Sequence, residues 1–372
     1  MGEVRRRAGG RGVTAGVDQR SLEGQVDASG VAGWMRDEGF DIDPATATMV
    51  RLVGGNSNVT FVLSDGDRAW VIRRPPLHAL DPSAHNMTRE WTVLNALRDK
   101  EVQAVQALAH CSDPKVIGAD FLVMEMVADA VSLLDELPPG YPSGAEALRP
   151  LGYGLVEALA DLQAVDWVAA GLTGFGRPDG FLERQVPRWA SQYRRNQVRE
   201  LPSFDRVTQW LGDHLPSPQA PAILHGDYHL DNCLFSAQRP ELLAVVDWEM
   251  ASVGDPLVDL GLCTALWGGR LVEEPAMPRI QAVSRQPGGP AREELVQCYA
   301  ARTGRDLSQI AWYQAFALWK LAVVIEPAWG QHVRGELRTP YTAALERDVP
   351  MLFDEAARFA GLDPLTDHED VR

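Results

Sequence analysis

The fold of this chain is decided by the stretch Ile223-Leu-His-Gly-Asp-Tyr-His-Leu-Asp-Asn-Cys-Leu-Phe235 and by the segment Leu243-Ala-Val-Val-Asp-Trp-Glu249. Together they place Asp227 five residues before Asn232, and Asp247 directly after an apolar run. The apolar flanks are typical of short buried strands, which would fix the polar groups at their ends. Two carboxylates and an amide oxygen in this order are the groups that phosphoryl transfer from a nucleotide requires.

Each polar residue of the stretch has a candidate role. Asp227 would orient the attacking hydroxyl and take its proton, with His225 as part of the same catalytic loop, while Asn232 and Asp247 would hold Mg²⁺. Taken singly, the residues also fit ordinary roles, because a Gly-Asp pair is typical of a turn. A His-x-Asp pair also fits a metal-dependent hydrolase, although His229 is the only further ligand nearby in the sequence.

Length and composition indicate an ordinary globular protein. The chain has 372 residues, 45% of them hydrophobic and 23% charged, which is enough for two domains and a substantial core. The net charge of −16 argues against a general nucleic-acid binder. Four cysteines without a C-x-x-C pair favour a reducing environment, so we expect a cytoplasmic protein.

Two further features concern membranes and the N-terminus. Residues 1–28 begin with an arginine- and glycine-rich stretch that lacks the apolar core of a secretory signal, and we expect a disordered tail. The most apolar long run, Ala315–Ile325, is interrupted by Lys320 and is too short to span a bilayer. The sequence therefore predicts a protein without a membrane partner.

The N-terminal part reads as a small antiparallel sheet preceded by a helix at Val31–Glu38. The expected strands are 49–53, 59–63 and 69–73, with a hairpin turn at Asp65-Gly66-Asp67. A glycine-bearing turn between the first two strands is a candidate to cover nucleotide phosphates. Its residues are Gly54, Gly55, Asn56, Ser57 and Asn58.

The third strand and the helix after it carry a candidate ion pair. Val71 and Arg73 share one face of the strand, so Val71 would line an adenine pocket and Arg73 would reach the phosphates. Residues 87–100 read as a helix in which Glu90 shares an inward stripe with Leu94 and Leu97. We pair Glu90 with Arg73, because an inward carboxylate needs a partner. Alternatively, Arg73 is a solvated strand-end charge and Glu90 favours only the helix dipole.

A later apolar strand, 119–127, ends at a predicted domain boundary near residue 128. The backbone near Glu125, Met126 and Val127 would meet the nucleotide base. Beyond it, helical patterns cover 146–165, 293–303 and 308–325, with a Pro/Gly-rich loop at 274–290. These helices would form the part of the protein that holds the phosphate acceptor.

His225-x-Asp227-x4-Asn232 resembles the catalytic loop of the aminoglycoside phosphotransferase and choline kinase branch of the protein-kinase-like fold. The resemblance implies an α+β, bilobal architecture, with a nucleotide-binding N-lobe at 29–127 and a mainly helical C-lobe at 128–372. It also implies ATP, or alternatively GTP, together with Mg²⁺. Asp259, which follows Asp-Pro-Leu-Val, would buttress the catalytic loop, although a helix-cap role is also open.

More specific phrases resemble one sub-branch, the kinase domain that animals fuse to acyl-CoA dehydrogenases. They are Gly54-Gly-Asn-Ser-Asn58, Val71-Ile-Arg-Arg-Pro-Pro76, Ser83-Ala-His85 with Arg89-Glu90, and Gly174-Phe-Gly-Arg-Pro178 with Gly180-Phe-Leu-Glu-Arg184. Arg73 in place of lysine is normal for that sub-branch. Gln163 departs from it, because the sub-branch tends to have histidine there, and we expect Gln163 to pack between helices.

The sub-branch implies an acceptor hydroxyl on an acyl chain, with 4-hydroxyacyl-CoA the natural candidate and a related hydroxy acid an alternative. Residues 187–200 read as a helix with Arg188, Arg195 and Arg199 on one face, a candidate site for the phosphates of CoA. The same arginines also fit a solvated face or pairs with nearby carboxylates. Glu249 is a further candidate to contact the acceptor.

Three readings of function therefore stay open. The first is an Mg²⁺-dependent kinase acting on the hydroxyl of a CoA-linked acceptor, and the second is an antibiotic- or other metabolite-directed kinase. The third is a nucleotide-binding pseudokinase scaffold, which the intact Asp227, Asn232 and Asp247 disfavour. The sequence leaves the oligomeric state open.

Overall fold

A computed structural model describes residues 26–52, 58–76, 86–268 and 280–363. The described chain divides into two compact units, and it passes from the first to the second at Val131–Ser132. The first unit contains the residues up to Asn95 together with Val105–Val131, and the short segment Ala96–Ala104 belongs with the second. Most of the predicted tail and residues 54–57 of the predicted phosphate-covering turn lie outside the described residues.

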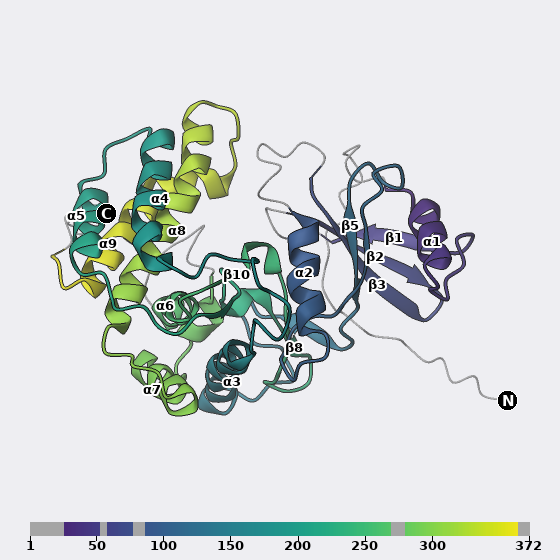
Figure 1. The fold of residues 1–372 in the computed structure, drawn as a ribbon, viewed down its shortest axis with the longest axis horizontal. Coiled ribbons are helices and arrows are strands. Elements are labelled where there is room, and N and C mark those ends of the chain that lie inside the picture. The colour runs from purple at the N-terminus through teal and green to yellow at the C-terminus, as the bar shows by residue number, and fades with distance from the viewer. Residues whose placement is uncertain (1–25, 53–57, 77–85, 269–279, 364–372) are drawn as a thin grey trace. The chain divides into compact units, whose positions relative to one another are not determined.

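The first unit is built on a five-stranded antiparallel sheet (Figure 1). The strands are β1 (Thr48–Arg51), β2 (Val59–Asp65), β3 (Arg68–Arg74), β4 (Ala107–Cys111) and β5 (Phe121–Glu125), in the order β1-β2-β3-β5-β4. Asp65 pairs with Arg68 across the predicted hairpin turn. Helix α1 (Ala28–Asp37) packs its buried Val31, Ala32 and Met35 into the core of this unit. The expected strand at 49–53 is real but shorter and begins one residue earlier.

Helix α2 (Met87–Leu97) follows the sheet strands β1 to β3 in the chain. Leu94 and Leu97 are buried, as the sequence predicts, and Glu90 is fully buried on the same stripe. The helix ends three residues before the predicted Lys100, since the backbone from residue 98 onward turns. Strand β6 (Ala130–Ser132) follows β5 and contains the point where the chain enters the second unit.

The second unit is mainly helical, which confirms the predicted α+β class of an antiparallel sheet followed by helices (Figure 1). Its helices are α3 (Ala145–Ala164), α4 (Phe181–Asn196), α5 (Pro202–Asp213), α6 (Leu257–Leu266), α7 (Arg292–Thr303), α8 (Ile310–Val333) and α9 (Pro340–Phe359). None of the helices in the described part of the chain has the length and apolar character that a membrane crossing needs.

Short strands and single turns within this unit carry the motif. They are β7 (Ala222–Leu224), η3 (Leu230–Asn232), β8 (Cys233–Ser236), β9 (Leu242–Val245), η4 (Trp248–Met250), β10 (Ser252–Gly254) and η5 (Ala282–Arg285). Strand β7 pairs with β10, and β8 lies between β6 and β9. The predicted buried strands on both sides of the motif are therefore present.

Helices α4 and α8 differ most from their predicted bounds. The sequence predicts a start at Pro187, but α4 begins at Phe181, after Gly180 in the left-handed region. It also ends at Asn196, four residues before the predicted end, because the backbone at Gln197 is extended. Helix α8 runs to Val333, eight residues past its predicted end.

Candidate active site

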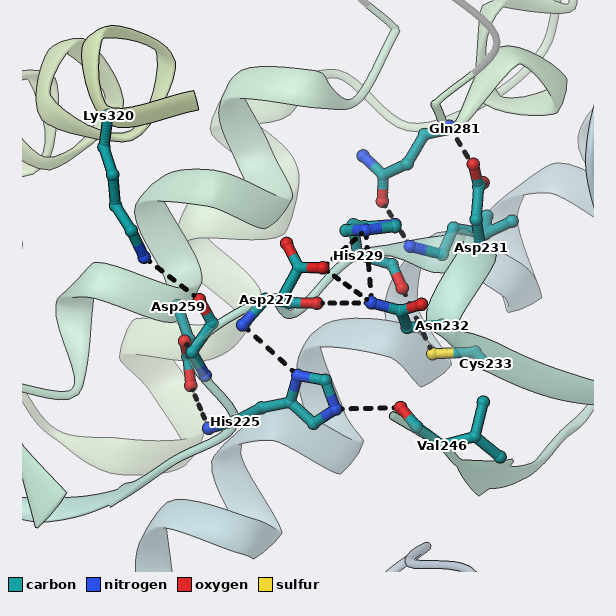
Figure 2. Close-up of polar contacts among 12 residues, drawn as sticks. His225, Asp227, His229, Asp231, Asn232, Cys233, Val246, Asp259, Gln281 and Lys320 are labelled. Atoms are coloured by element: carbon teal, nitrogen blue, oxygen red, sulfur yellow. Dashed lines mark hydrogen bonds and ion pairs between the residues drawn. The ribbon is translucent and has the colours of Figure 1, made fainter. Parts of the chain in front are cut away.

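The loop after β7 is held by one buried carboxylate (Figure 2). Asp259, in the first turn of α6, is 0% exposed and accepts hydrogen bonds from the backbone N–H groups of His225 (2.7 Å) and Gly226 (2.9 Å). Burial raises the pKa of Asp259, while these two backbone donors act in the opposite direction. The contacts confirm that Asp259 buttresses the loop, as the resemblance implies.

His225 connects the loop to the end of β9. Its Nε2–H donates to the carbonyl of Val246 (2.9 Å), and its Nδ1 accepts from the backbone N–H of Asp227 at 3.3 Å. This pattern requires the neutral ring with its proton on Nε2. Because both ring nitrogens are engaged within the protein and the ring is buried, His225 positions Asp227.

Gly226 is the one residue type that this turn accepts. Its φ is +86°, and a Cβ added there would lie 2.3 Å from the carbonyl oxygen of Met250. The glycine of the motif therefore lets the loop pass close to η4, which carries the residues after Asp247.

Asp227, His229 and Asn232 form a cluster within the loop (Figure 2). The Asn232 side-chain amide donates to the Asp227 carbonyl (2.9 Å) and to its carboxylate (3.1 Å), and His229 Nε2 lies 3.4 Å from the same carboxylate. Burial favours the neutral form of Asp227, but the electrostatic interaction and hydrogen bond with His229, with a smaller contribution from Lys320, hold its pKa well below 3.8. The Asp227 side chain is 39% exposed, so an ionised carboxylate faces outward.

The same coupling acts on His229. Burial alone lowers the pKa of this ring, but the charge and hydrogen bond of Asp227 outweigh burial and raise it. The contact between the two side chains therefore favours the ionised form of Asp227.

Asn232 and Asp247 are brought together by strand pairing. Cys233 lies opposite Val245 in the β8–β9 pair, and the backbone N–H of Val246 donates to the carbonyl of Asn232 (2.9 Å). Asp247 follows directly, with φ +68° and ψ +61°, a left-handed conformation that non-glycine residues adopt mainly at functional sites. The short hairpin thus brings the backbone of these two residues, 15 apart in the chain, close together.

Gln281, which the sequence assigned only to a loop, anchors the far end of the motif. It is 0% exposed, and its side chain accepts from the N–H of Leu230 (2.8 Å) and donates to the carbonyl of Cys263 (2.9 Å). Its backbone N–H donates to Asp231 (2.9 Å). A glutamine at φ +53° has no sequence signature, so pattern reasoning had no means to find it.

Lys320, which the sequence treats only as an interruption of an apolar run, also reaches the loop. Its Nζ on α8 donates to the carbonyl of Gly226 (3.2 Å) and lies 5.3 Å from the centroid of the Trp189 ring. A single lysine within the apolar run 315–325 was the available signal, because such a charge needs a partner.

In the first unit, the predicted pair of Arg73 and Glu90 is present. Arg73 Nε lies 3.2 Å from a carboxylate oxygen of Glu90, and the two side chains are 10% and 1% exposed. Val71 lies opposite Met124 of β5, and Asn58 is buried just before β2. This confirms the ion pair over the alternative of a solvated strand-end arginine, while the roles of these residues toward a nucleotide stay predictions.

The residues predicted to meet the base follow β5. Glu125 accepts a hydrogen bond from the backbone N–H of Gln106 (2.8 Å), Met126 is 47% exposed, and Val127 is partly buried. An exposed apolar side chain next to a strand end is compatible with the predicted contact to a planar base.

The predicted arginine face is not a single face. Arg188 lies over the ring of Trp189 (4.9 Å), and the exposed Arg195 donates to the Ser191 hydroxyl (2.7 Å). Arg199 lies beyond the end of α4.

Arg199 is instead bound within the protein. Its Nε and Nη2 donate to the two carboxylate oxygens of Glu326 at 3.0 and 2.8 Å, and further donors go to the carbonyls of Leu345 and Glu346. Of the alternatives that the sequence left open for these arginines, pairing with a carboxylate is the one that describes Arg199. Glu249, in η4, is partly buried, and its contact with an acceptor stays a prediction.

Comparison with known proteins agrees with this geometry. The family model of the phosphotransferase enzyme family matches residues 48–295. The chain is 32% identical to acyl-CoA dehydrogenase family member 11 of Rattus norvegicus over 80% of this chain and 38% of that protein. It is also 32% identical to family member 10 of Mus musculus over 76% of this chain and 26% of that protein. The chain thus spans less than half the length of these relatives.

Solved structures give the same result. A protein from Ralstonia eutropha JMP134 named for the aminoglycoside phosphotransferases has a TM-score of 0.74 at 28% identity, covering 91% of this chain and 99% of that one. Macrolide 2′-phosphotransferase type I has a TM-score of 0.56 at 18% identity, over 87% and 96% of the two chains, which supports the fold. The chain belongs to the phosphotransferase enzyme family.

Proposed function

We propose that this chain transfers the γ-phosphoryl group of ATP to a hydroxyl group on an acyl chain carried by coenzyme A, with a 4-hydroxyacyl-CoA as the natural acceptor. The observation that carries the proposal is the ionised Asp227 held next to Asn232 by the Asp259-anchored loop. The CoA-linked acceptor is supported by the relatives, whose names place them among the acyl-CoA dehydrogenases.

Asp227 is suited to the proton step. Its carboxylate is ionised and partly exposed, so it can accept a hydrogen bond from the acceptor hydroxyl and take the proton as the bond to phosphorus forms. Asn232 fixes the carboxylate from one side and His229 stabilises its charge. Because the transition state of phosphoryl transfer is loose, orientation and charge placement are the main contributions of such a residue.

Asn232 and Asp247 have the donor chemistry that Mg²⁺ prefers. The Asn232 amide nitrogen is committed to Asp227, which directs the opposite, oxygen end of that amide away from Asp227 (Figure 2). An amide oxygen beside a carboxylate is a hard oxygen pair, and Mg²⁺ usually takes one or two such protein ligands together with substrate phosphates and water. When bound, the ion would neutralise charge on the phosphates.

In the first unit, Arg73 would contact the nucleotide phosphates while Glu90 fixes its orientation. A planar guanidinium donates two parallel hydrogen bonds, so it suits phosphate oxygens better than a single ammonium does. Asn58 and the glycine-bearing turn before it would cover the phosphates, and the backbone of 125–127 would meet the base. ATP is the proposed nucleotide, with GTP as the alternative.

A CoA-linked acceptor fits the local charge better than a polycationic antibiotic does. Arg188 lies close enough to Lys320 to lower its pKa, so further positive charge is disfavoured there. Arg195 is exposed on the same helix as Arg188. An aminoglycoside would bring several ammonium groups toward them, whereas CoA brings phosphates. The likeness to antibiotic phosphotransferases nevertheless makes an antibiotic acceptor the second candidate.

The deciding experiment measures transfer of labelled γ-phosphate from ATP, with Mg²⁺, into hydroxyacyl-CoAs, the matching free hydroxy acids and aminoglycosides. We expect label in the hydroxyacyl-CoAs, with a lower KM than for the free acids. Arg195→Ala should raise KM for the CoA thioester but not for the free acid. Label in aminoglycosides alone would replace the proposal with the antibiotic reading, and Mg·ATP binding without turnover would favour a scaffold.

The metal assignment has its own test. Asp247→Asn is expected to abolish the Mg²⁺ dependence of ATP binding measured by calorimetry, while ATP binding without metal stays as in the wild type. Unchanged Mg²⁺-dependent binding in this variant would remove Asp247 from the site.

A further inference from the structure

Lys320 is a charged residue among buried apolar side chains, and hydrophobic packing alone does not explain its presence there. It lies on α8 among buried residues such as Trp319, Ala322 and Val323, where an unpaired ammonium would be costly. Its Nζ donates to the carbonyl of Gly226, and the Trp189 ring of α4 lies beneath it. The side chain thus extends from α8 to the peptide immediately before the proposed catalytic carboxylate (Figure 2).

That peptide is fixed at both of its polar ends. The carbonyl of Gly226 accepts from Lys320 (3.2 Å), and the N–H of Asp227, in the same peptide plane, donates to His225 Nδ1 (3.3 Å). The preceding N–H, that of Gly226, donates to Asp259. With a glycine at φ +86° in between, the backbone has little steric preference of its own, so these side chains set its orientation.

We propose that Lys320 is a positioning residue for Asp227: through the Gly226 carbonyl, it sets the plane of the Gly226–Asp227 peptide and hence the direction of the catalytic carboxylate. This inference rests on the proposed function, because it assigns Lys320 a role in the same transfer. Neither the motif nor the first unit contains Lys320, which lies 93 residues after Asp227 in the chain.

The charge of Lys320 is part of this role. The groups that face it are Asp227 on the loop, Asp259 on α6 and Arg188 on α4. Burial lowers the pKa of Lys320 below 10.5, the two aspartates raise it, and Arg188 lowers it. As pH rises, the ammonium therefore loses its proton earlier than an exposed lysine would, and the hydrogen bond to Gly226 loses its charge-assisted character.

The test uses Lys320→Met and Lys320→Arg, with Lys115→Met as the matched control at an exposed lysine of the first unit. In the transfer assay, Lys320→Met is expected to lower kcat by about 100-fold, the cost of a small misplacement of a reacting group, with KM for ATP unchanged. Lys320→Arg keeps the charge and should retain most of kcat. It should also remove the alkaline fall in kcat that we expect for the wild type as Lys320 deprotonates.

A second measurement does not depend on turnover. Hydrogen–deuterium exchange of peptides covering 223–230 should be faster in Lys320→Met than in the wild type, while peptides of α9 are unchanged. Faster exchange throughout the second unit, or unchanged exchange at 223–230, would overturn the inference, as would wild-type kcat in Lys320→Met. If the wild type itself transfers no phosphate, the proposed function fails and the exchange comparison alone decides the role of Lys320.

Discussion

The catalytic loop and the arginine segment around α4 belong to the same unit, and both were predicted from short patterns of charged residues, yet they differ in outcome. In the loop, Asp227, His229 and Asn232 contact one another, because their partners lie a few residues away in the chain. In the arginine segment, Arg199 finds its partner Glu326 127 residues later, on α8. A pattern of charged residues thus predicts a site when the hydrogen-bond and ion-pair partners lie within the same motif. It is ambiguous when residues far away in the chain supply those partners.

The largest expected effect comes from the loop. Asp227→Ala should lower kcat by about 10²–10⁴-fold, the range associated with a positioned general base. The fold should persist, since the contacts of Asp259 with the loop involve backbone groups that the substitution keeps. Phosphate transfer and thermal denaturation, measured on the same preparation, would check both statements. Turnover near that of the wild type would remove Asp227 from the mechanism.

In the arginine segment, the expected effect is on stability. Arg199→Met leaves Glu326, 1% exposed, without its bidentate partner, which should cost about 3–5 kcal/mol of unfolding free energy. We expect kcat and the KM for the acceptor to stay as in the wild type. Urea denaturation and steady-state kinetics would measure the two properties separately.

A double variant sharpens this result. Arg199→Met combined with Glu326→Leu replaces the pair by apolar side chains and should recover most of the lost stability, because no buried charge then lacks a partner. If Arg199→Met instead raised KM for the acceptor with little loss of stability, the arginine would belong to the acceptor site after all.

A pH-dependent effect of intermediate size is expected next to the loop. Burial raises the pKa of Asp231 to about 6, against the opposing charge of His229. Since the folded state then binds this proton more tightly than the unfolded state, Asp231 favours folding below about pH 3.9, and this contribution is lost as pH rises through about 6.

Asp231→Asn removes that titration and keeps an oxygen to accept from the Gln281 N–H. As pH rises from about 4 to 7, the free energy of unfolding of the variant should therefore increase by about 1–3 kcal/mol relative to that of the wild type. Denaturation curves over this range would show it. A constant difference between the two proteins would mean that Asp231 has the same pKa when folded and unfolded.

These contrasts also explain what could be predicted from sequence. The sheet, the hairpin at Asp65 to Arg68 and the pair of Arg73 with Glu90 follow from local periodicity and strand alternation. The contribution of Asp259 could be inferred only from resemblance, because its bonds go to backbone groups that any sequence offers.

Other parts were beyond prediction for a physical reason. Gln281 and Lys320 act through backbone carbonyls and N–H groups of distant segments. The lone lysine signals that Lys320 needs a partner, but a backbone partner leaves no trace in residue identity. The predicted start of α4 was wrong because Pro187 is compatible with a first helical turn. In the structure Pro187 instead lies inside the helix, which its neighbours in the sequence do not reveal.

The smallest expected effect concerns Gln163, where the related sub-branch tends to have histidine. Gln163 is 5% exposed, donates to the carbonyl of Pro256 (2.9 Å) and accepts from the Tyr299 hydroxyl. It thereby ties α3 to the residue that precedes α6, three positions before Asp259. Neutral histidine also offers one donor and one acceptor, so Gln163→His should cost at most about 1 kcal/mol of stability and leave kcat unchanged. Gln163→Leu, the matched control, removes both bonds and should cost more, about 1–3 kcal/mol. A change in kcat with Gln163→His at unchanged stability would instead show that this position has a chemical role, and the packing contact would then be secondary.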